Sequence, residues 1–445
     1  MVNSIAYLDI LLSIIYILVI LLVARVFRPK KTELYNSFFL KYVYFKIVFA
    51  IFFALIYLFY FKGGDTFLYF NGSVFFLEQI AHNPGNIINL LFNDFDSLRN
   101  LAYTKNQYLN IYLRSSDTLL TSRILIPFTF LCFKQYLATT ILFTVFTSIG
   151  LWKLYATLCK IYPTLYKYFA FGILFYPTIG IWGSGILKDP ITLMCVALTF
   201  SCFYNFSNAK RLIPSLIIVS VAIYVCLILK PYILYVFLPC MLLWLQNRIS
   251  SSFKSTASKV LMATVLSSVF LFSGFFLMQS ISASAGKYSL ENVEQIAEGF
   301  QSWHTYLAET RNQSGYSLGK FEFNAQGIFQ KSPAAFFVTF FRPFIFTDVT
   351  NLSLAFEAIQ SFILLLASVY VFLKVGVFKF FRIALFNKNV SAFFLFAVIF
   401  GITVGLTSYN FGALSRYKIP ALPFYTASLA IIYYIGYLKP KKGYA

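Results

Sequence analysis

Long apolar runs recur along almost the whole chain, from Ala6 to Leu438, and they constrain the fold more than any other feature. A helix that crosses a bilayer needs about 20 consecutive, mostly apolar residues. The composition agrees, because 59% of the 445 residues are apolar, only 11% are charged, and the mean hydropathy is +0.75. We therefore predict an all-α, polytopic integral membrane protein, and the composition excludes an ordinary soluble domain.

Eleven runs have the length and composition of membrane-spanning helices, and they leave no room for an appended soluble domain, so we predict a single transmembrane domain over residues 1–445. We place the spans at residues 6–24, 43–61, 136–155, 168–184, 190–206, 212–229, 231–246, 260–280, 354–373, 391–408 and 420–438. Two connections are long, residues 62–134 and 281–351. In the first we expect amphipathic helices in the membrane interface, over 67–77 and 88–102. In the second we expect a helix with a solvated acidic face over 290–309.

Positive charge marks the predicted cytoplasmic side. With the amino terminus outside, the cytoplasmic segments and the membrane edges beside them carry 20 lysines and arginines against one acid, Glu33. Cytoplasmic connections collect such cations, so the net charge of +21 reflects topology, and no nucleic-acid partner is expected. We predict a bacterial cytoplasmic membrane protein with its amino terminus outside, its carboxyl terminus in the cytoplasm, and both long connections outside, where loops carry function.

No pattern in the sequence indicates a disulfide framework or a metal site. Neither long outer connection contains a pair of cysteines, and His82 and His304 each lack a second ligand at metal-binding spacing. We expect no required cofactor, although a divalent cation shared between Asp65 and a lipid phosphate is left open. We expect the cysteines to be small buried apolar residues: Cys132, Cys159, Cys195, Cys202, Cys226 and Cys240.

Asp65 is the candidate catalytic residue. It follows Gly63 and Gly64 directly after a predicted span, at the start of the first amphipathic stretch. This position puts a carboxylate within reach of both lipid headgroups and water, where ionisable groups usually have a function. The structural alternative is an N-cap, in which the Asp65 carboxylate accepts backbone N–H bonds at the start of the helix.

A second group of candidates precedes two predicted spans. Lys188 and Asp189 stand before a proline, and so does Lys230. These are also ordinary helix-start signals, and a lysine there can extend its side chain to the interface. The turn at residues 183–185 contains two glycines, however, which allow backbone N–H groups to approach an anionic headgroup. We therefore predict that Lys188, Asp189 and Lys230 bind the substrate or its phosphate.

Three further cations lie in the later outer segments. Arg342 stands among phenylalanines and a proline at a membrane boundary, where an arginine is costly unless it finds an anion. Arg416 and Lys418 lie just ahead of a helix predicted from Pro420, near a helix N-terminus, which favours anions over cations. A bound phosphate would resolve this conflict, and pairing with membrane-lipid phosphates is the alternative. We predict that Arg342, Arg416 and Lys418 bind the substrate phosphate.

Two short motifs, Gly64-Asp65-Thr66 and Arg416-Tyr417-Lys418-Ile419-Pro420, together with this organisation, resemble the polytopic GT-C glycosyltransferases of cell envelopes. Those enzymes carry an acidic residue in the first long outer loop, followed by interfacial helices, and commonly an Arg-Tyr and proline stretch late in the chain. The resemblance implies a polyprenyl-phosphate-linked sugar donor, a lipid-linked or surface glycan acceptor, Asp65 as general base, and outer cations that hold the phosphate. Here the loop follows the second span, so an extra amino-terminal helix is expected.

Two alternatives remain open. Two long outer loops with arginines also look like the Wzy- and EpsG-type polymerases, which join lipid-linked oligosaccharide repeat units. A lipid-glycan flippase or other transporter belongs to a different class, in which polar residues and broken helices gather near the bilayer midplane. Asp9 and Lys46 are almost the only charges inside the predicted spans. This distribution favours an enzyme that acts at the outer face.

Overall fold

The computed structural model describes residues 6–94, 107–250, 314–319 and 321–439, with isolated positions between 255 and 306. Every regular element in these ranges is helical, which confirms the all-α prediction. The chain divides into two compact units. Unit 1 comprises Met1–Lys153, Ile179–Ala197 and Tyr224–Lys230, and unit 2 comprises Leu154–Thr178, Leu198–Ile223 and Pro231–Ala445.

Four helices contribute residues to both units, and the others belong to one. Unit 1 contains α1 (Tyr7–Val26), α2 (Phe39–Leu55), α3 (Asp65–His82), α4 (Ile87–Phe92), α5 (Gln107–Leu113) and α6 (Ser116–Leu131). The divided helices are α7 (Tyr136–Ile161), α9 (Pro177–Trp182), α10 (Lys188–Ser207) and α11 (Leu212–Leu229). Unit 2 contains α8 (Tyr166–Phe169), α12 (Pro231–Ser250), α15 (Ala325–Phe341), α16 (Leu352–Val375), α17 (Val377–Phe386), α18 (Ser391–Thr407), α19 (Phe411–Tyr417) and α20 (Leu422–Tyr433).

Seven helices in the described ranges are long and apolar enough to cross a membrane, as expected of a polytopic membrane protein. They are Tyr7–Val26, Leu34–Phe61, Tyr136–Ile161, Lys188–Ser207, Leu212–Leu229, Pro231–Ile249 and Leu354–Val375. Two more predicted spans fall in bent pairs, α17 with α18 at 98° and α19 with the Leu422–Leu438 helix at 67°. The predicted span at 260–280, the acidic helix at 290–309 and the end of the amphipathic stretch at 88–102 lie outside the described residues.

The segment predicted as one span over 168–184 is broken into shorter pieces. Helix α8 continues into a wider helical turn at Ala170–Leu174, and α9 begins only at Pro177. Tyr176 lies between them outside any helix, because the ring of a following proline disfavours helical backbone at the preceding residue. This proline is visible in the sequence, but the prediction of one span relies only on the length of the apolar run.

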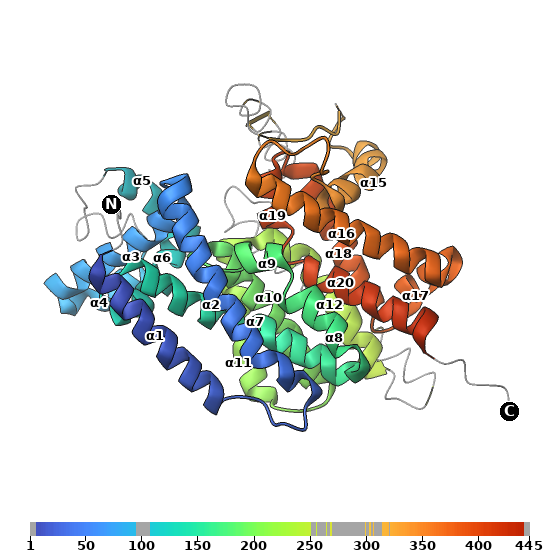
Figure 1. The fold of residues 1–445 in the computed structure, drawn as a ribbon, viewed down its shortest axis with the longest axis horizontal. Helices are drawn as coiled ribbons and strands as arrows, with labels where there is room; N and C mark the ends of the chain where they lie inside the picture. The colour runs from blue at the N-terminus through green and yellow to red at the C-terminus, as the bar shows by residue number, and fades with distance from the viewer. Residues whose placement is uncertain are drawn as a thin grey trace. The chain divides into compact units, whose positions relative to one another are not determined.

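In unit 1, α3 packs lengthwise against α6 (Figure 1). The amphipathic stretch at 67–77 is helical as predicted, and its buried residues include Phe70, Gly72 and Phe76. Close approach of the two helices depends on Gly72, since a Cβ there would lie 2.4 Å from Ser122 Oγ. No helix is predicted at α6 from the sequence, so this contact with α3 is not anticipated.

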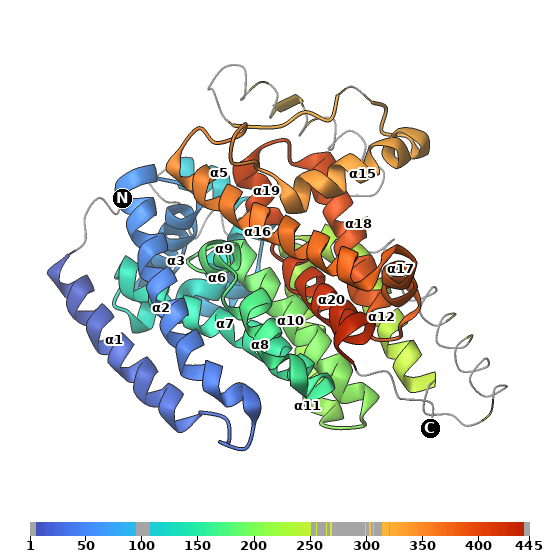
Figure 2. The ribbon, with the colours of Figure 1, turned by 45° about the vertical axis from the view of Figure 1, so that its right-hand side comes forward.

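In unit 2, α15 lies along α18 (Figure 2). Gly401 and Gly405 stand one turn apart on α18, and a Cβ at Gly405 would lie 2.2 Å from the Ala335 carbonyl oxygen. Thr339 Oγ1 donates to the Gly401 carbonyl oxygen at 2.7 Å. Small residues four apart are the usual device for close helix contact within membranes. Part of the second long connection therefore packs as a helix against a predicted span.

Two charged residues of the first two helices are buried against backbone. Lys46 of α2 is 1% exposed, and its Nζ donates to the carbonyl oxygens of Ile179 at 3.2 Å and Gly183 at 2.8 Å. Asp9 of α1 is 3% exposed, and its carboxylate accepts the N–H bonds of Leu137 and Ala138, both at 2.9 Å. Asp9 thereby satisfies amide groups at the start of α7 that have no partner within that helix.

Candidate functional site

Asp65 is the first residue of α3, and its side chain is half-buried. The N-cap position belongs to Gly64, whose φ of 116° suits glycine, so the capping role considered for Asp65 is not the one observed. The first turn of α3 is held in place, because the buried Thr66 hydroxyl lies 2.9 Å from the Tyr136 hydroxyl of α7. A carboxylate in the first turn is also favoured by the helix dipole. Asp65 therefore lies at a helix start that the Thr66–Tyr136 contact holds in place, where the helix dipole favours a negative charge.

Lys188 begins α10 and forms an ion pair with Asp117 of α6. Its Nζ lies 2.6 Å from Asp117 Oδ2, and the two side chains are only 14% and 11% exposed. The same ammonium lies 5.2 Å from the centre of the Tyr69 ring. Tyr69 follows Asp65 by one helical turn, so the two project from the same face of α3. The structure thus places Lys188 against the helical face from which Asp65 projects.

Lys230 and Asp189 form a second buried ion pair in the same unit. Lys230 Nζ lies 2.5 Å from Asp189 Oδ1, and the side chains are 10% and 2% exposed. Because Asp189 directly follows Lys188, the two ion pairs share the first turn of α10. Lys188, Asp189 and Lys230 were all predicted as site residues, and the structure brings them together. It also shows that both lysines are neutralised by carboxylates of the chain.

Asp117 is the member of this group that sequence reasoning missed. It lies in the first turn of α6, where its carboxylate accepts the Ser115 hydroxyl and, at 2.9 Å, the Thr118 N–H. The signal was present in the sequence, since two serines and an aspartate directly precede an apolar run, which is a helix-start pattern. The sequence predicts only interfacial stretches in the first long connection, so this helix start is missed.

In unit 2, Arg342 finds an anion within its own chain. Its Nη2 lies 2.5 Å from Asp348 Oδ1 and its Nε 2.8 Å from Oδ2. The guanidinium also lies over the rings of Phe344 and Phe411, at 5.5 and 5.2 Å. The expectation that this arginine requires an anion is therefore met, but by Asp348, which the sequence analysis did not select. These contacts hold the Arg342 side chain in place in the segment between α15 and α16.

The pH dependence of stability should reveal the Arg342–Asp348 pair. Burial raises the pKa of Asp348, but hydrogen bonds from Arg342 and the Phe344 N–H outweigh burial and hold the pKa below its usual 3.8. The stabilisation is therefore complete above pH 3.8 and is lost as the pH falls through the lower pKa of the folded state. We expect Asp348→Asn to lower the unfolding free energy by about 1.5–3 kcal/mol at pH 7.

The measurement is thermal unfolding of both proteins in detergent over a series of pH values. The difference between wild type and Asp348→Asn should be constant near neutrality and shrink only at strongly acidic pH. A difference that is the same at every pH would show that the ionised carboxylate of Asp348 is not what stabilises this segment.

Arg416 and Lys418 also lie in unit 2, with an acid that was not predicted. Lys418 is 3% exposed and Glu357 is 4% exposed, and the Glu357 carboxylate acts electrostatically on the Lys418 ammonium. The Ser415 hydroxyl donates to Glu357. Arg416 lies in the last turn of α19, the helix end that favours cations, so the sequence argument that it faces an unfavourable helix terminus is wrong. That helix was hidden because its seven residues are too short to show periodicity.

The predicted site residues therefore fall into two groups, Asp65, Lys188, Asp189 and Lys230 in unit 1, and Arg342, Arg416 and Lys418 in unit 2. Within the described ranges, no three His, Cys, Asp or Glu side chains lie close enough together to hold a metal ion. Comparisons of the chain with protein-family models, with curated proteins and with solved structures each gave no match.

Proposed function

We propose that the protein is a membrane glycosyltransferase that takes a sugar from a polyprenyl phosphate at the outer face of a bacterial cytoplasmic membrane. The observation that carries this proposal is the two buried lysine–aspartate pairs in unit 1, which share the first turn of α10. Lys188, a member of the first pair, lies against Tyr69 on the face of α3 from which Asp65 projects. Buried ion pairs are expensive and seldom stabilise a fold more than apolar residues would. Ionisable groups in a membrane protein are by default a functional hypothesis.

The chemistry assigns a separate task to each charge. Asp65 takes the proton from the acceptor hydroxyl while that oxygen bonds to the anomeric carbon and the bond from this carbon to the phosphate oxygen breaks. Such general-base assistance contributes roughly 10²- to 10⁴-fold. Lys188 and Lys230 stabilise the negative charge that collects on the departing phosphate. In the absence of donor, Asp117 and Asp189 keep these lysines neutralised, and the phosphate becomes an additional partner when the donor binds.

The test is a reaction with purified protein in lipid nanodiscs. Polyprenyl-phosphate sugars are supplied with lipid-linked oligosaccharide acceptors, and the products are identified by mass spectrometry. A transferase extends the acceptor by one sugar. A ladder of repeat units from lipid-linked repeats alone would instead establish a polymerase of the Wzy or EpsG type. Unchanged lipids with every donor and acceptor tried would remove the enzymatic proposal.

One observation favours a transporter as the second candidate. Lys46 is a fully buried lysine on a membrane-spanning helix, held by carbonyl groups of another segment, and buried charges of this kind mark substrate pathways in transporters. Proteoliposomes loaded with a fluorescent lipid-linked sugar distinguish the two. A transporter exposes the probe to an external quencher, whereas a transferase leaves its distribution unchanged.

A further inference from the structure

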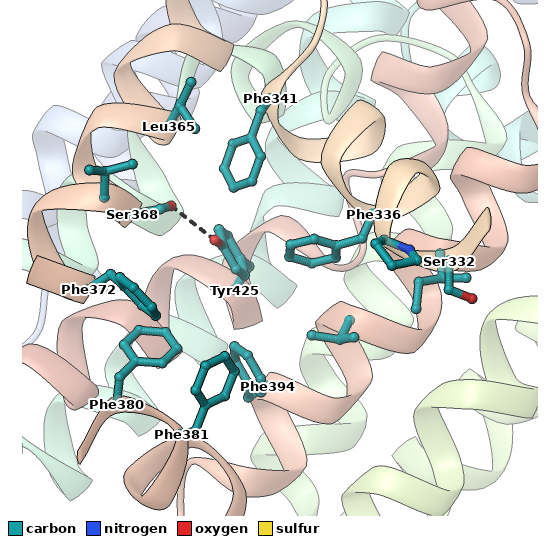
Figure 3. A pocket seen from close by; sticks show the side chains of 14 residues that line it. Ser332, Phe336, Phe341, Leu365, Ser368, Phe372, Phe380, Phe381, Phe394 and Tyr425 are labelled. Atoms are coloured by element: carbon teal, nitrogen blue, oxygen red, sulfur yellow. Dashed lines mark hydrogen bonds between the residues drawn. The ribbon is translucent and has the colours of Figure 1, made fainter. Parts of the chain in front are cut away.

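An apolar pocket of about 600 Å³ lies within unit 2, bordered by α15, α16, α17, α18 and α20. Six phenylalanines line it, and Tyr425 stands among them (Figure 3). Its volume falls in the range of roughly 300–1,000 Å³ found for sites that bind small molecules. Except for α15, the helices around the pocket belong to the candidate membrane spans or to the bent pairs, and the charged groups described above do not line the pocket.

The polar atoms that reach this pocket are already hydrogen-bonded within the chain. The Tyr425 hydroxyl lies 2.9 Å from Ser368 Oγ (Figure 3), and Ser332 Oγ donates to the Ile328 carbonyl oxygen at 2.6 Å. An occupant that displaced these bonds would leave buried hydroxyl groups without partners, which is unfavourable. The pocket therefore suits a hydrocarbon chain and offers nothing to a sugar or a phosphate.

Helix α17, which forms one wall, has the character of a helix in the membrane interface. It is bent by 98° from α18, so it runs across the direction of that membrane helix. Phe378 and Phe386 are 93% and 83% exposed, and they share this short helix with exposed cations. Exposed aromatic side chains beside basic residues are typical of helices that lie between the headgroups and the hydrocarbon.

Three cations lie on α16 and α17, two of the helices that contribute residues to the pocket. Lys379 directly precedes the pocket residue Phe380, and its ammonium donates to the Gly436 carbonyl oxygen. Arg382 directly follows the pocket residue Phe381. Lys374, in the last turn of α16, lies 5.9 and 5.7 Å from the Tyr370 and Tyr437 rings. All three cations are exposed. An apolar pocket with exposed cations on two of its helices matches a lipid that has an apolar tail and a negative headgroup.

We propose that this pocket holds one acyl chain of an anionic phospholipid, whose phosphate lies against Lys374, Lys379 and Arg382. On the predicted orientation these cations belong to the cytoplasmic leaflet, whereas the proposed donor site lies at the outer face. The lipid is therefore a bound component of the fold, separate from the glycosyl donor. The proposal depends on membrane insertion and does not depend on the proposed enzymatic activity.

Native mass spectrometry of the purified full chain tests the proposal, with dioleoyl phosphatidylglycerol, dioleoyl phosphatidylcholine and undecaprenyl phosphate added in turn. The wild type should retain one phosphatidylglycerol in preference to phosphatidylcholine. Val398→Trp, which fills the pocket, should abolish retention of both phospholipids. The double variant Lys379→Gln with Arg382→Gln should keep the chain site but lower the preference for phosphatidylglycerol about 30-fold, the effect expected of two interfacial cations.

Ile399→Trp is the matched control, because Ile399 is the neighbour of Val398 on α18, is 45% exposed and does not line the pocket. This variant should retain phosphatidylglycerol as the wild type does. Equal retention by Val398→Trp and the wild type would overturn the proposal. Retention of undecaprenyl phosphate in place of phosphatidylglycerol would also overturn it and would assign the pocket to a prenyl chain. Activity of the protein toward sugars has no part in these outcomes.

Discussion

Replacing Asp65 with asparagine should lower glycosyl transfer by roughly 10²- to 10⁴-fold while donor binding stays nearly unchanged. Asparagine keeps the size of the side chain but cannot accept a proton from the acceptor hydroxyl. The start of α3 should also survive, because Gly64 and the Thr66–Tyr136 contact position it without the Asp65 carboxylate. The measurement compares the initial rate of acceptor extension with donor affinity in nanodiscs.

Glu78→Gln is the matched control for Asp65→Asn. Glu78 lies on the same helix, is 53% exposed, and pairs with Lys134 at 3.3 Å. An exposed ion pair of this kind contributes little to stability, so the control should transfer sugar at the wild-type rate. If Asp65→Asn transfers sugar as fast as this control, Asp65 is not the general base. If it binds no donor, Asp65 has a role in binding.

The second large effect is expected from Lys230→Met, which should destabilise the protein by about 3–5 kcal/mol. The substitution removes the ammonium that lies 2.5 Å from Asp189, whose side chain is only 2% exposed. An ionised carboxylate left buried without its lysine raises the free energy of the folded state well above that of the protein with the intact ion pair. Thermal unfolding in detergent can be followed with a thiol-reactive dye, because all six cysteines are free and buried in the folded protein.

Two further variants separate the ion pair from loss of a side chain. The double variant Lys230→Met with Asp189→Asn removes both charges and should recover most of the lost stability. Lys134→Met removes a lysine whose partner is exposed, and it should change the unfolding free energy by less than about 0.5 kcal/mol. A loss in Lys134→Met equal to that in Lys230→Met would contradict the importance of burial.

Apolar length predicted most of the long apolar helices correctly, because the cost of exposing polar backbone to lipid leaves few options. Seven of the predicted spans coincide with helices long enough to cross a membrane. The same criterion failed at residues 168–184, where Pro177 interrupts the helix. It also gave no sign of α15, which packs against α18 through a glycine-mediated contact within the second long connection. The length of an apolar run reflects only average hydrophobicity. Helix breaks and close helix contacts depend instead on single residues such as proline and glycine.

The candidate site was harder to predict than the fold. Lys188 and Lys230 are predicted as site residues because they stand just before prolines at predicted span starts, Lys188 beside a turn whose glycines can admit an anionic headgroup, and both lysines form ion pairs at the first turn of α10. Their partners are set by tertiary packing, and Asp117 is 71 residues from Lys188 in the sequence. Arg342 illustrates the opposite error, since the need for an anion was recognised, but the anion is Asp348, only six residues further along. The order of residues in a sequence does not identify which charged side chains pair with each other in the folded protein.

The backbone contacts of Lys46 and Asp9 have a consequence for biosynthesis. The acceptors of Lys46 lie more than 130 residues later, and the amide groups bound by Asp9 lie more than 120 residues later. The ribosome therefore delivers both helices to the insertion machinery before it has made the groups that satisfy their charges. We therefore expect a chain truncated before residue 137 to be degraded faster than the full chain, because Asp9 and Lys46 then lack the groups that satisfy their charges.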